Sequence, residues 1–290
     1  VGGGGSYQEY GMNSLGDGGK AGIVSVYGGT LNAQGGYCGA GIGGGNHSGY
    51  NYMKDCANGG TVHIYDNATV NATGGAYGAG IGGGADSHGA NVTIDGGSVT
   101  ATGGTNGAGI GGGENGDGSI LTINGGDVTS RGTGYGAGIG GGKHTFTLNW
   151  VHGRGNDTFI NGGTVTAIAG ENCKSRESSG GSAIGGGDGV GGKTKLLLPR
   201  KLEIADNMMV TGGDAADDIE RVFTVAERID ACRWRNYVKI EACQHTAQNN
   251  DAADVVTTYT IADEDDHIKH CRYCAVTSKE IQIEDRKSVV

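Results

Sequence analysis

The sequence is poor in several residue types, and each shortage excludes a class of protein. It has one proline among 290 residues, and its glycines do not fall at every third position, so a collagen triple helix is excluded. No apolar run is long enough to span a membrane as a helix. Acidic residues outnumber basic ones, the net charge is −10, and no basic stripe is interleaved with aromatic residues. Nucleic acid is therefore not an expected partner.

Cysteine is present, but its number argues against a fold held by disulfides alone. Seven cysteines leave at least one without a partner. Helical signals are also missing, because no window of ten or more residues places apolar residues at helical spacing. The fold must therefore be built from strands and turns.

Glycine is abundant, with 64 copies, and much of it lies in one repeated motif, Gly-Ala-Gly-Ile-Gly-Gly-Gly. The isoleucines of successive motifs are 39, 29, 29 and 45 residues apart, so the base unit has 29 residues and the first and fourth intervals carry insertions. A fixed period of this length is typical of a solenoid. The motif isoleucines are Ile42, Ile81, Ile110, Ile139 and Ile184.

Each unit also carries two short triplets in which apolar, polar and apolar residues alternate, as in Val92–Ile94 and Val99–Ala101. This alternation predicts strands with one buried face, and the glycine pairs between them supply tight corners. We therefore predict an all-β fold, a parallel β-helix of about six coils with three short strands in each coil. The last coil has Val210–Gly212 as its second strand. In the unit at 91–113 the inward residues are Val92, Ile94, Val99, Ala101, Ala108 and Ile110.

The composition divides the chain into four parts. Residues 1–213 form the β-helix, which we expect to be truncated because the chain begins inside a glycine-rich corner. Residues 214–242 are charged and strand-like, and we predict a cap, since an open end would expose the core and unpaired strand edges. Residues 285–290 match the translation of a sequencing-adapter read-through, and we interpret them as an artefactual tail.

The remaining part, residues 243–284, is a small Cys/His module. Thiolates and imidazoles are the usual ligands of a structural zinc ion. A module this small has little hydrophobic core, so a bound metal ion would be needed to stabilise its fold. A disulfide between two of its cysteines, or free thiols, would explain the same residues. The predicted zinc ligands are Cys243, His245, Cys271 and Cys274, with His267 as a substitute.

The repeat unit, Val-Thr-Ile-x-Gly-Gly-x-Val-Thr-Ala followed by the glycine-rich motif, resembles repeats in large surface proteins of anaerobic Gram-positive bacteria. Those repeats are similar to carbohydrate-binding right-handed β-helix domains. The resemblance covers residues 21–213, and a segment at 231–245 resembles sequences that follow such repeats. It implies a right-handed coil, export, association with the cell wall and a glycan partner. It carries no catalytic motif.

Two sets of side chains are candidates for binding a polysaccharide or cell-wall glycan. Exposed tyrosine rings just before the glycine-rich motif could stack on sugar rings, and two of them lie two coils apart, about 10 Å. The long insertions carry further aromatic and basic side chains, and irregular loops on a rigid scaffold often bind ligands. The predicted binding residues are Tyr37, Tyr77, Tyr135, Trp150, His152 and Arg154.

Other functions remain open. Asp86–His88 and Glu114–Asp117 offer oxygen ligands for calcium, although their spacing is not that of a calcium roll. A polysaccharide lyase or hydrolase would need clustered carboxylates, and the sequence shows none at matched positions in successive coils. We therefore predict a non-catalytic, secreted or cell-surface binding protein or adhesive stalk. A polysaccharide-degrading β-helix enzyme and a purely structural spacer are the alternatives.

Overall fold

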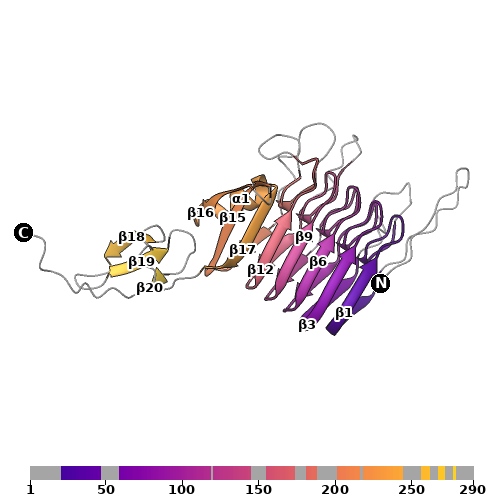
Figure 1. The fold of residues 1–290 in the computed structure, drawn as a ribbon, viewed down its shortest axis with the longest axis horizontal. Helices are drawn as coiled ribbons and strands as arrows, with labels where there is room; N and C mark the ends of the chain where they lie inside the picture. Colours follow the sequence, from indigo (N-terminus) through magenta and orange to yellow (C-terminus); the bar gives the residue numbers. More distant parts are fainter. Residues whose placement is uncertain are drawn as a thin grey trace, which may run out of the picture.

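The structure is a computed structural model, and it describes most of the repeats. The described residues are 21–46, 59–118, 120–144, 155–173, 181–187, 201–215 and 218–243, with the backbone of 256–261, 267–271 and 277–278. Within them the chain coils repeatedly, and successive coils stack along one axis (Figure 1). The described residues form an all-β fold, as predicted, except for one short helix that was not predicted, and the strand pairing is mostly parallel.

Each complete coil has three sides, and in the coils after the first two each side is a separate strand. In the central coil these are β5 (Asn91–Ile94), β6 (Ser98–Thr102) and β7 (Ile110–Gly111). The corner between β5 and β6 is Asp95-Gly96-Gly97, where Gly97 has a φ of +79°. The predicted role of the glycine pairs is therefore confirmed at this corner.

The strands of neighbouring coils pair in parallel and in register. The first side continues through β8 (Ile120–Ile123), β11 (Asp157–Ile160) and β14 (Lys201–Ile204). The second continues through β9 (Asp127–Arg131) and β12 (Thr164–Ile168). The third side is a separate sheet of two-residue strands: β2 (Ile42–Gly43), β4 (Ile81–Gly82), β7, β10 (Ile139–Gly140) and β13 (Ile184–Gly185).

The first two coils differ in one respect from the prediction of separate triplets. Their first and second strands form single continuous strands, β1 (Ile23–Gln34) and β3 (Thr61–Thr73). The pairing between them shifts register between Val26 and Gly28, because the β3 corner is one residue longer.

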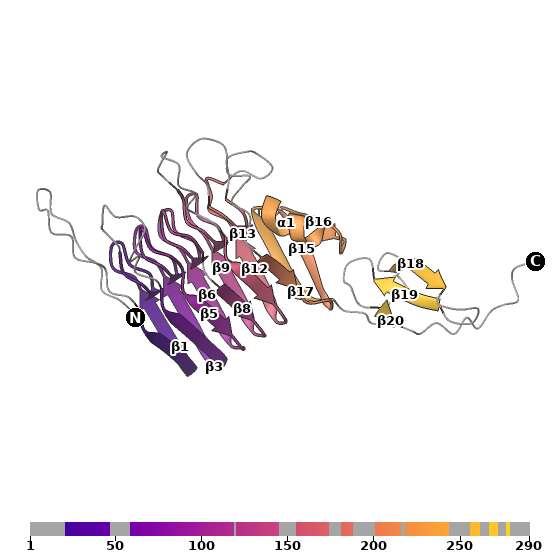
Figure 2. The same cartoon turned by 180° about the vertical axis from the view of Figure 1, so that it is seen from behind.

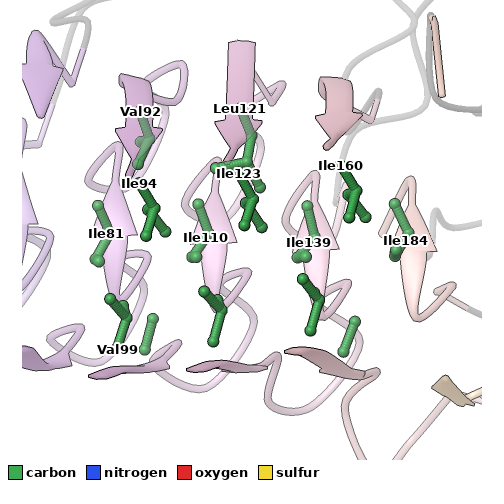
Figure 3. Packing of buried hydrophobic residues seen from close by; sticks show 14 of the residues in the cluster. Ile81, Val92, Ile94, Val99, Ile110, Leu121, Ile123, Ile139, Ile160 and Ile184 are labelled. Carbon is green, nitrogen blue, oxygen red and sulfur yellow. The ribbon is translucent and has the colours of Figure 1, made fainter. Parts of the chain in front are cut away.

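The core is a set of apolar ladders inside the coils. Figure 3 shows the isoleucines of the Ile-Gly strands facing the side chains of the first and second strands. The residues predicted to point inward are all buried: Val92, Ile94, Val99, Ala101, Ala108 and Ile110 are at most 2% exposed. One buried side chain of this size contributes about 1.5–3 kcal/mol, so stacking several coils makes the core.

The prediction for the last coil is wrong in one strand. β14 continues the first side, but β15 (Met208–Ala215), which holds the expected second strand, does not pair with β12. The antiparallel strand β17 (Tyr237–Ala242) lies between them and pairs with both. Because no glycine-rich motif follows β15, the chain has no third side to form and reverses into β16 (Asp218–Phe223).

A short helix, α1 (Arg228–Trp234), was not predicted, because seven residues are too few to show a helical period. The carbonyl of Arg235, the residue that caps its C-terminus, accepts a hydrogen bond from the Ala183 amide beside β13 (2.8 Å). The guanidinium of Arg228 is buried and donates to the carbonyls of Ile204, Ala205 and Met208 at 3.0–3.2 Å. Figure 2 shows this closing segment at the end of the coils that carries β12 and β13.

The C-terminal region contains a further small antiparallel sheet. It consists of β18 (Val256–Ile261), β19 (His267–Cys271) and β20 (Thr277–Ser278).

Candidate functional site

Two loops flank the Ile-Gly strand of each coil, and they bring the predicted tyrosines close to polar side chains. The loop before the strand holds the ring positions, and the loop after it lies against the preceding coil. The Glu114 amide donates to the Tyr77 carbonyl (2.8 Å), and the Lys143 amide donates to the Asn106 carbonyl (2.8 Å). We name the side chains at this edge the loop-side cluster: Tyr37, Tyr77, Asn106, Glu114, Tyr135 and Lys143.

The backbone of these loops is held tightly, which fixes the side chains. The Gly107 amide bonds the Gly104 carbonyl, and the Gly116 amide bonds the Gly113 carbonyl, each at 2.8 Å, so both loops close as short turns. Asp86 and Asn115 occupy equivalent places one coil apart, with φ of 55° and 59°. The Asn115 amide nitrogen donates to Asp86 Oδ1 at 2.9 Å. These contacts stack one loop on the next.

The structure brings two of the predicted rings together. Tyr37 and Tyr77 meet edge to face, with centroids 5.7 Å apart and planes at 86°. Tyr37 is 71% exposed, so one ring of the pair offers an open face. Tyr135 is two coils beyond Tyr77, and the Lys143 ammonium lies 4.8 Å from its ring centroid. The coil between them places Asn106 at the corresponding position.

Several titratable groups of this edge have displaced pKa values. Burial is the main cause that raises the pKa of the Glu114 carboxyl, and the charge of Asp86 adds to it; a hydrogen bond from Asn106 and the charge of Lys143 act in the opposite direction. Burial, Asp86 and Glu114 raise the pKa of the Cys38 thiol. A hydrogen bond with Tyr37 is the first cause that raises the pKa of Tyr77. Displaced pKa values gather at functional sites, although structural networks also produce them.

A pair of carboxylates missed in the sequence lies here. Asp86 and Glu114 belong to successive coils, the Asp86 amide donates to the Glu114 carbonyl (2.7 Å), and their charges interact. They do not occupy matched positions of the repeat, which is why a search at matched positions finds nothing. An alignment of the 29-residue repeats would have found this pair only if each position had also been compared with the positions next to it in the following repeat.

A comparison with protein families supports the repeated coils seen in the structure. The model of the family described as "Beta helix repeat" matches residues 24–46, 62–85, 92–114, 121–143 and 160–188. Each matched segment begins in a first strand and ends after the Ile-Gly strand. The chain contains a β-helix repeat domain. No curated protein and no solved structure shows significant similarity to the chain.

Other predicted site residues of the β-helix repeat domain and its neighbour fall outside the described residues. These are Trp150, His152 and Arg154 in the second insertion, and His245 and Cys274 in the Cys/His module. Cys243 follows β17 and is half-buried. His267 and Cys271 are the end residues of β19, and their side chains are not described. The zinc site therefore stays a prediction.

The predicted calcium positions take part in contacts between coils. Besides the Asn115–Asp86 bond, the Asp117 amide donates to His88 Nδ1 at 3.3 Å. Among the described residues, no three His, Cys, Asp or Glu side chains are grouped so as to hold a metal ion. Calcium also stays a prediction. In the same part of the chain, no helix is long and apolar enough to cross a membrane.

Proposed function

We propose that the β-helix repeat domain binds carbohydrate at the loop-side cluster and does not catalyse a reaction. The observation that carries this proposal is the row of tyrosine rings along one edge of the coils: the exposed Tyr37 ring packed against the half-buried Tyr77, and a third ring at Tyr135. Aromatic faces take the apolar face of a sugar, and neighbouring polar groups take its hydroxyls. Asn106, Glu114 and Lys143 supply such groups between the rings.

The rigidity of the scaffold supports binding rather than mere exposure of aromatic residues. Each loop bonds the loop of the next coil through its backbone, so the rings are held before a ligand arrives. A preorganised site loses less conformational entropy when it binds. The insertion that carries Trp150, His152 and Arg154 follows directly after His144, next to Lys143 in sequence. We propose that these three side chains add to the same surface.

The proposal extends to the setting of the domain. We propose a secreted or cell-surface protein of bacterial origin whose partner is a polysaccharide or cell-wall glycan. The coils form a right-handed parallel β-helix of about six turns, and the general handedness of parallel crossover connections supports this. The Cys/His module binds zinc through Cys243, His245, Cys271 and Cys274. Elemental analysis of the purified chain tests that part, and less than about half an equivalent of zinc would overturn it.

A glycan array screened with the whole chain tests carbohydrate binding. We expect wild-type protein to bind one glycan class, and the variants Tyr77→Ala, Tyr135→Ala and Trp150→Ala to bind it more weakly. Thr129→Ala, an exposed position on the second side, is the matched control and should bind as wild type does. If the three tyrosine and tryptophan variants all bound the glycan as strongly as wild type does, the proposed site would be contradicted. A wild-type protein that binds no glycan would leave a structural spacer as the function.

Hydrolysis of a polysaccharide is a second candidate, favoured by the Asp86–Glu114 pair. Glycosidases use two carboxyl groups, one of which stays protonated to act as an acid. Glu114 has the raised pKa that this role needs, and it lies beside the Tyr37–Tyr77 rings. Release of reducing ends from a bound polysaccharide, abolished by Glu114→Gln but not by Asp127→Asn, would favour this candidate over simple binding.

A further inference from the structure

A second surface of the coils combines aromatic and polar side chains, and no part of it belongs to the loop-side cluster. It is the outer face of the first strands, which we name the first-strand face; β5 and β8 are seen in Figure 2. Because the strands pair in register, the central outward position of each forms a straight row across the coils. The row contains Ser25, His63, Thr93, Thr122, Phe159 and Glu203.

One end of this face is an aromatic column. The rings of Tyr27 and Tyr65 stack with centroids 4.4 Å apart and planes at 13°. The imidazole of His63 lies 4.0 Å from the Tyr65 ring at 27°. Tyr27 is the outermost ring of the column and is 69% exposed. The column therefore presents an ordered aromatic surface to solvent.

A polar ladder continues from the column along the corner of the coils. His63 Nε2 lies 2.6 Å from Asp95 Oδ2, and the Asn124 amide donates to Asp95 Oδ1 at 2.7 Å. The Asn161 amide donates to Asn124 Oδ1 at 2.8 Å. The hydrogen bond from Asn124, followed by that from His63, lowers the pKa of Asp95, so this carboxylate is ionised at neutral pH. The ladder thus holds a charged acceptor and exposed amides in fixed positions.

The other end of the face is also aromatic. The Lys201 ammonium lies 5.1 Å from the ring centroid of Phe159 and 2.6 Å from Glu203 Oε1. Three strand spacings separate the row positions of His63 and Phe159, which corresponds to about 14 Å. Two aromatic ends joined by hydrogen-bonding groups over this length match a short stretch of an extended sugar chain.

The charges of the face select the kind of sugar chain. Its carboxylates are Asp95, Asp157 and Glu203, and Lys201 is its ammonium group. Lys201 is already paired with Glu203, so the described residues of the face leave no other lysine or arginine for an anionic polymer. Carboxylates accept hydrogen bonds from hydroxyl groups but repel uronic acids and phosphates. An uncharged polysaccharide fits this balance, whereas a polyanion does not.

We infer that the first-strand face is a second binding surface for an uncharged, linear polysaccharide that runs along the axis of the coils. One sugar ring packs on the Tyr27–Tyr65 column and another on Phe159. The hydroxyls between them bond the Asp95–Asn124 ladder. This inference rests on the proposed function because it assumes a carbohydrate ligand, but it places that ligand on a different surface. It makes the domain bivalent, since the loop-side cluster lies on a different side of the coils.

Affinity electrophoresis of the whole chain in gels containing xylan, mannan, mixed-linkage β-glucan or polygalacturonate tests the inference. The key variant is Tyr27→Asn combined with Phe159→Thr, because Asn and Thr already occupy these places in other coils and should fold there. Wild type should be retarded by at least one neutral polymer and not by polygalacturonate. The double variant should bind that polymer about tenfold more weakly with an unchanged melting temperature.

The comparison with Tyr77→Ala separates the two sites. If Tyr77→Ala loses binding and the first-strand double variant keeps wild-type affinity, this inference is wrong and the proposed function stands. If the reverse is found, the first-strand face is the main site. Retardation by polygalacturonate that matches or exceeds that by neutral polymers would overturn the charge argument. A wild-type chain retarded by none of the neutral polymers would overturn this inference, whereas the proposed function would stand if the glycan array shows binding.

Discussion

In the repeated coils every strand pairs in parallel with an equivalent strand, whereas the segment that closes them pairs in antiparallel fashion and repeats nothing. The coils satisfy their backbone through neighbours of the same shape and bury ladders of Ile, Val and Ala. The closing segment inserts β17 beside β12 and uses the buried Arg228 to bond three carbonyls of the last turn. Stacking of equivalent strands therefore stabilises the middle of the solenoid, whereas antiparallel pairing and the hydrogen bonds of one buried arginine stabilise its end.

This difference predicts that glycine positions in the coils tolerate the least change. Gly111 has a φ of +142°, and a Cβ there would strike the Gly140 carbonyl of the next coil. Gly111→Ala should therefore lower the free energy of unfolding by about 4 kcal/mol or more, measured by urea denaturation. Gly22→Ala is the control, because its added Cβ would meet no atom within 4 Å. Equal stability of the two variants would contradict the tight stacking of the third side.

The apolar ladders should show the next largest effect. Ile110 is fully buried between equivalent isoleucines, and Ile110→Ala should cost about 2–5 kcal/mol in unfolding free energy. Ile120→Ala, at a 44% exposed position one strand along the chain, should cost less than about 1 kcal/mol. Thermal and urea unfolding of both variants measure this difference. A similar cost at the two positions would mean that the coils do not enclose the core as described.

Substitutions in the closing segment should lower stability locally, at the end of the coils. Arg228→Met removes the donors of three carbonyls and should cost about 2–4 kcal/mol, because buried acceptors lose their partners. Arg233→Met, on the same helix, breaks only a 3.6 Å pair with the exposed Asp230 and should cost less than about 1 kcal/mol. Hydrogen exchange should report the Arg228 loss first at β15 and β17. Uniform loss over all coils would instead show that the end and the middle unfold as one unit.

The smallest expected effect concerns pH. Folding raises the pKa of Glu114 above its usual value of 4.5, so the folded chain holds this proton more tightly than the unfolded chain does. The stability that this proton provides is present below pH 4.5 and is lost as the pH rises through the raised pKa. Glu114→Gln should therefore exceed wild type in stability at pH 7 by less than about 1 kcal/mol, with the gap closing at pH 4. Melting temperatures at both pH values measure this stability difference. A difference that grows at pH 4 would contradict the claim that folding raises the pKa of Glu114.

The repeated part of the fold could be predicted from the sequence because one period fixes every coil. Ile94 and Ile110 are recognised as buried from their spacing alone, and both are buried. The closing segment has no second copy to compare, so the antiparallel insertion of β17 and the short helix before it were missed. Arg228 gives no signal in the sequence, since its partners are backbone carbonyls of a distant strand.

The proposed binding surfaces were predicted only in part, for a related reason. Tyr77 and Tyr135 stand at the same place in the repeat, and Tyr37 stands one residue before that place in its own coil. The structure brings the rings of Tyr37 and Tyr77 together. Asp86 and Glu114 meet although they occupy different places in the repeat, because a loop of one coil leans on the preceding coil. Tyr27 and Tyr65 could have been found by the same alignment that found the other tyrosines, since both directly follow a first-strand triplet.

Titration of a binding polysaccharide into wild-type protein and the Tyr37→Ala/Tyr77→Ala double variant, followed by calorimetry, tests carbohydrate binding most directly. Removal of the Tyr37–Tyr77 ring pair should raise the Kd about tenfold or more while the melting temperature stays within the range of Thr129→Ala. The same Kd for wild type and the double variant would contradict the assignment of binding to the loop-side cluster.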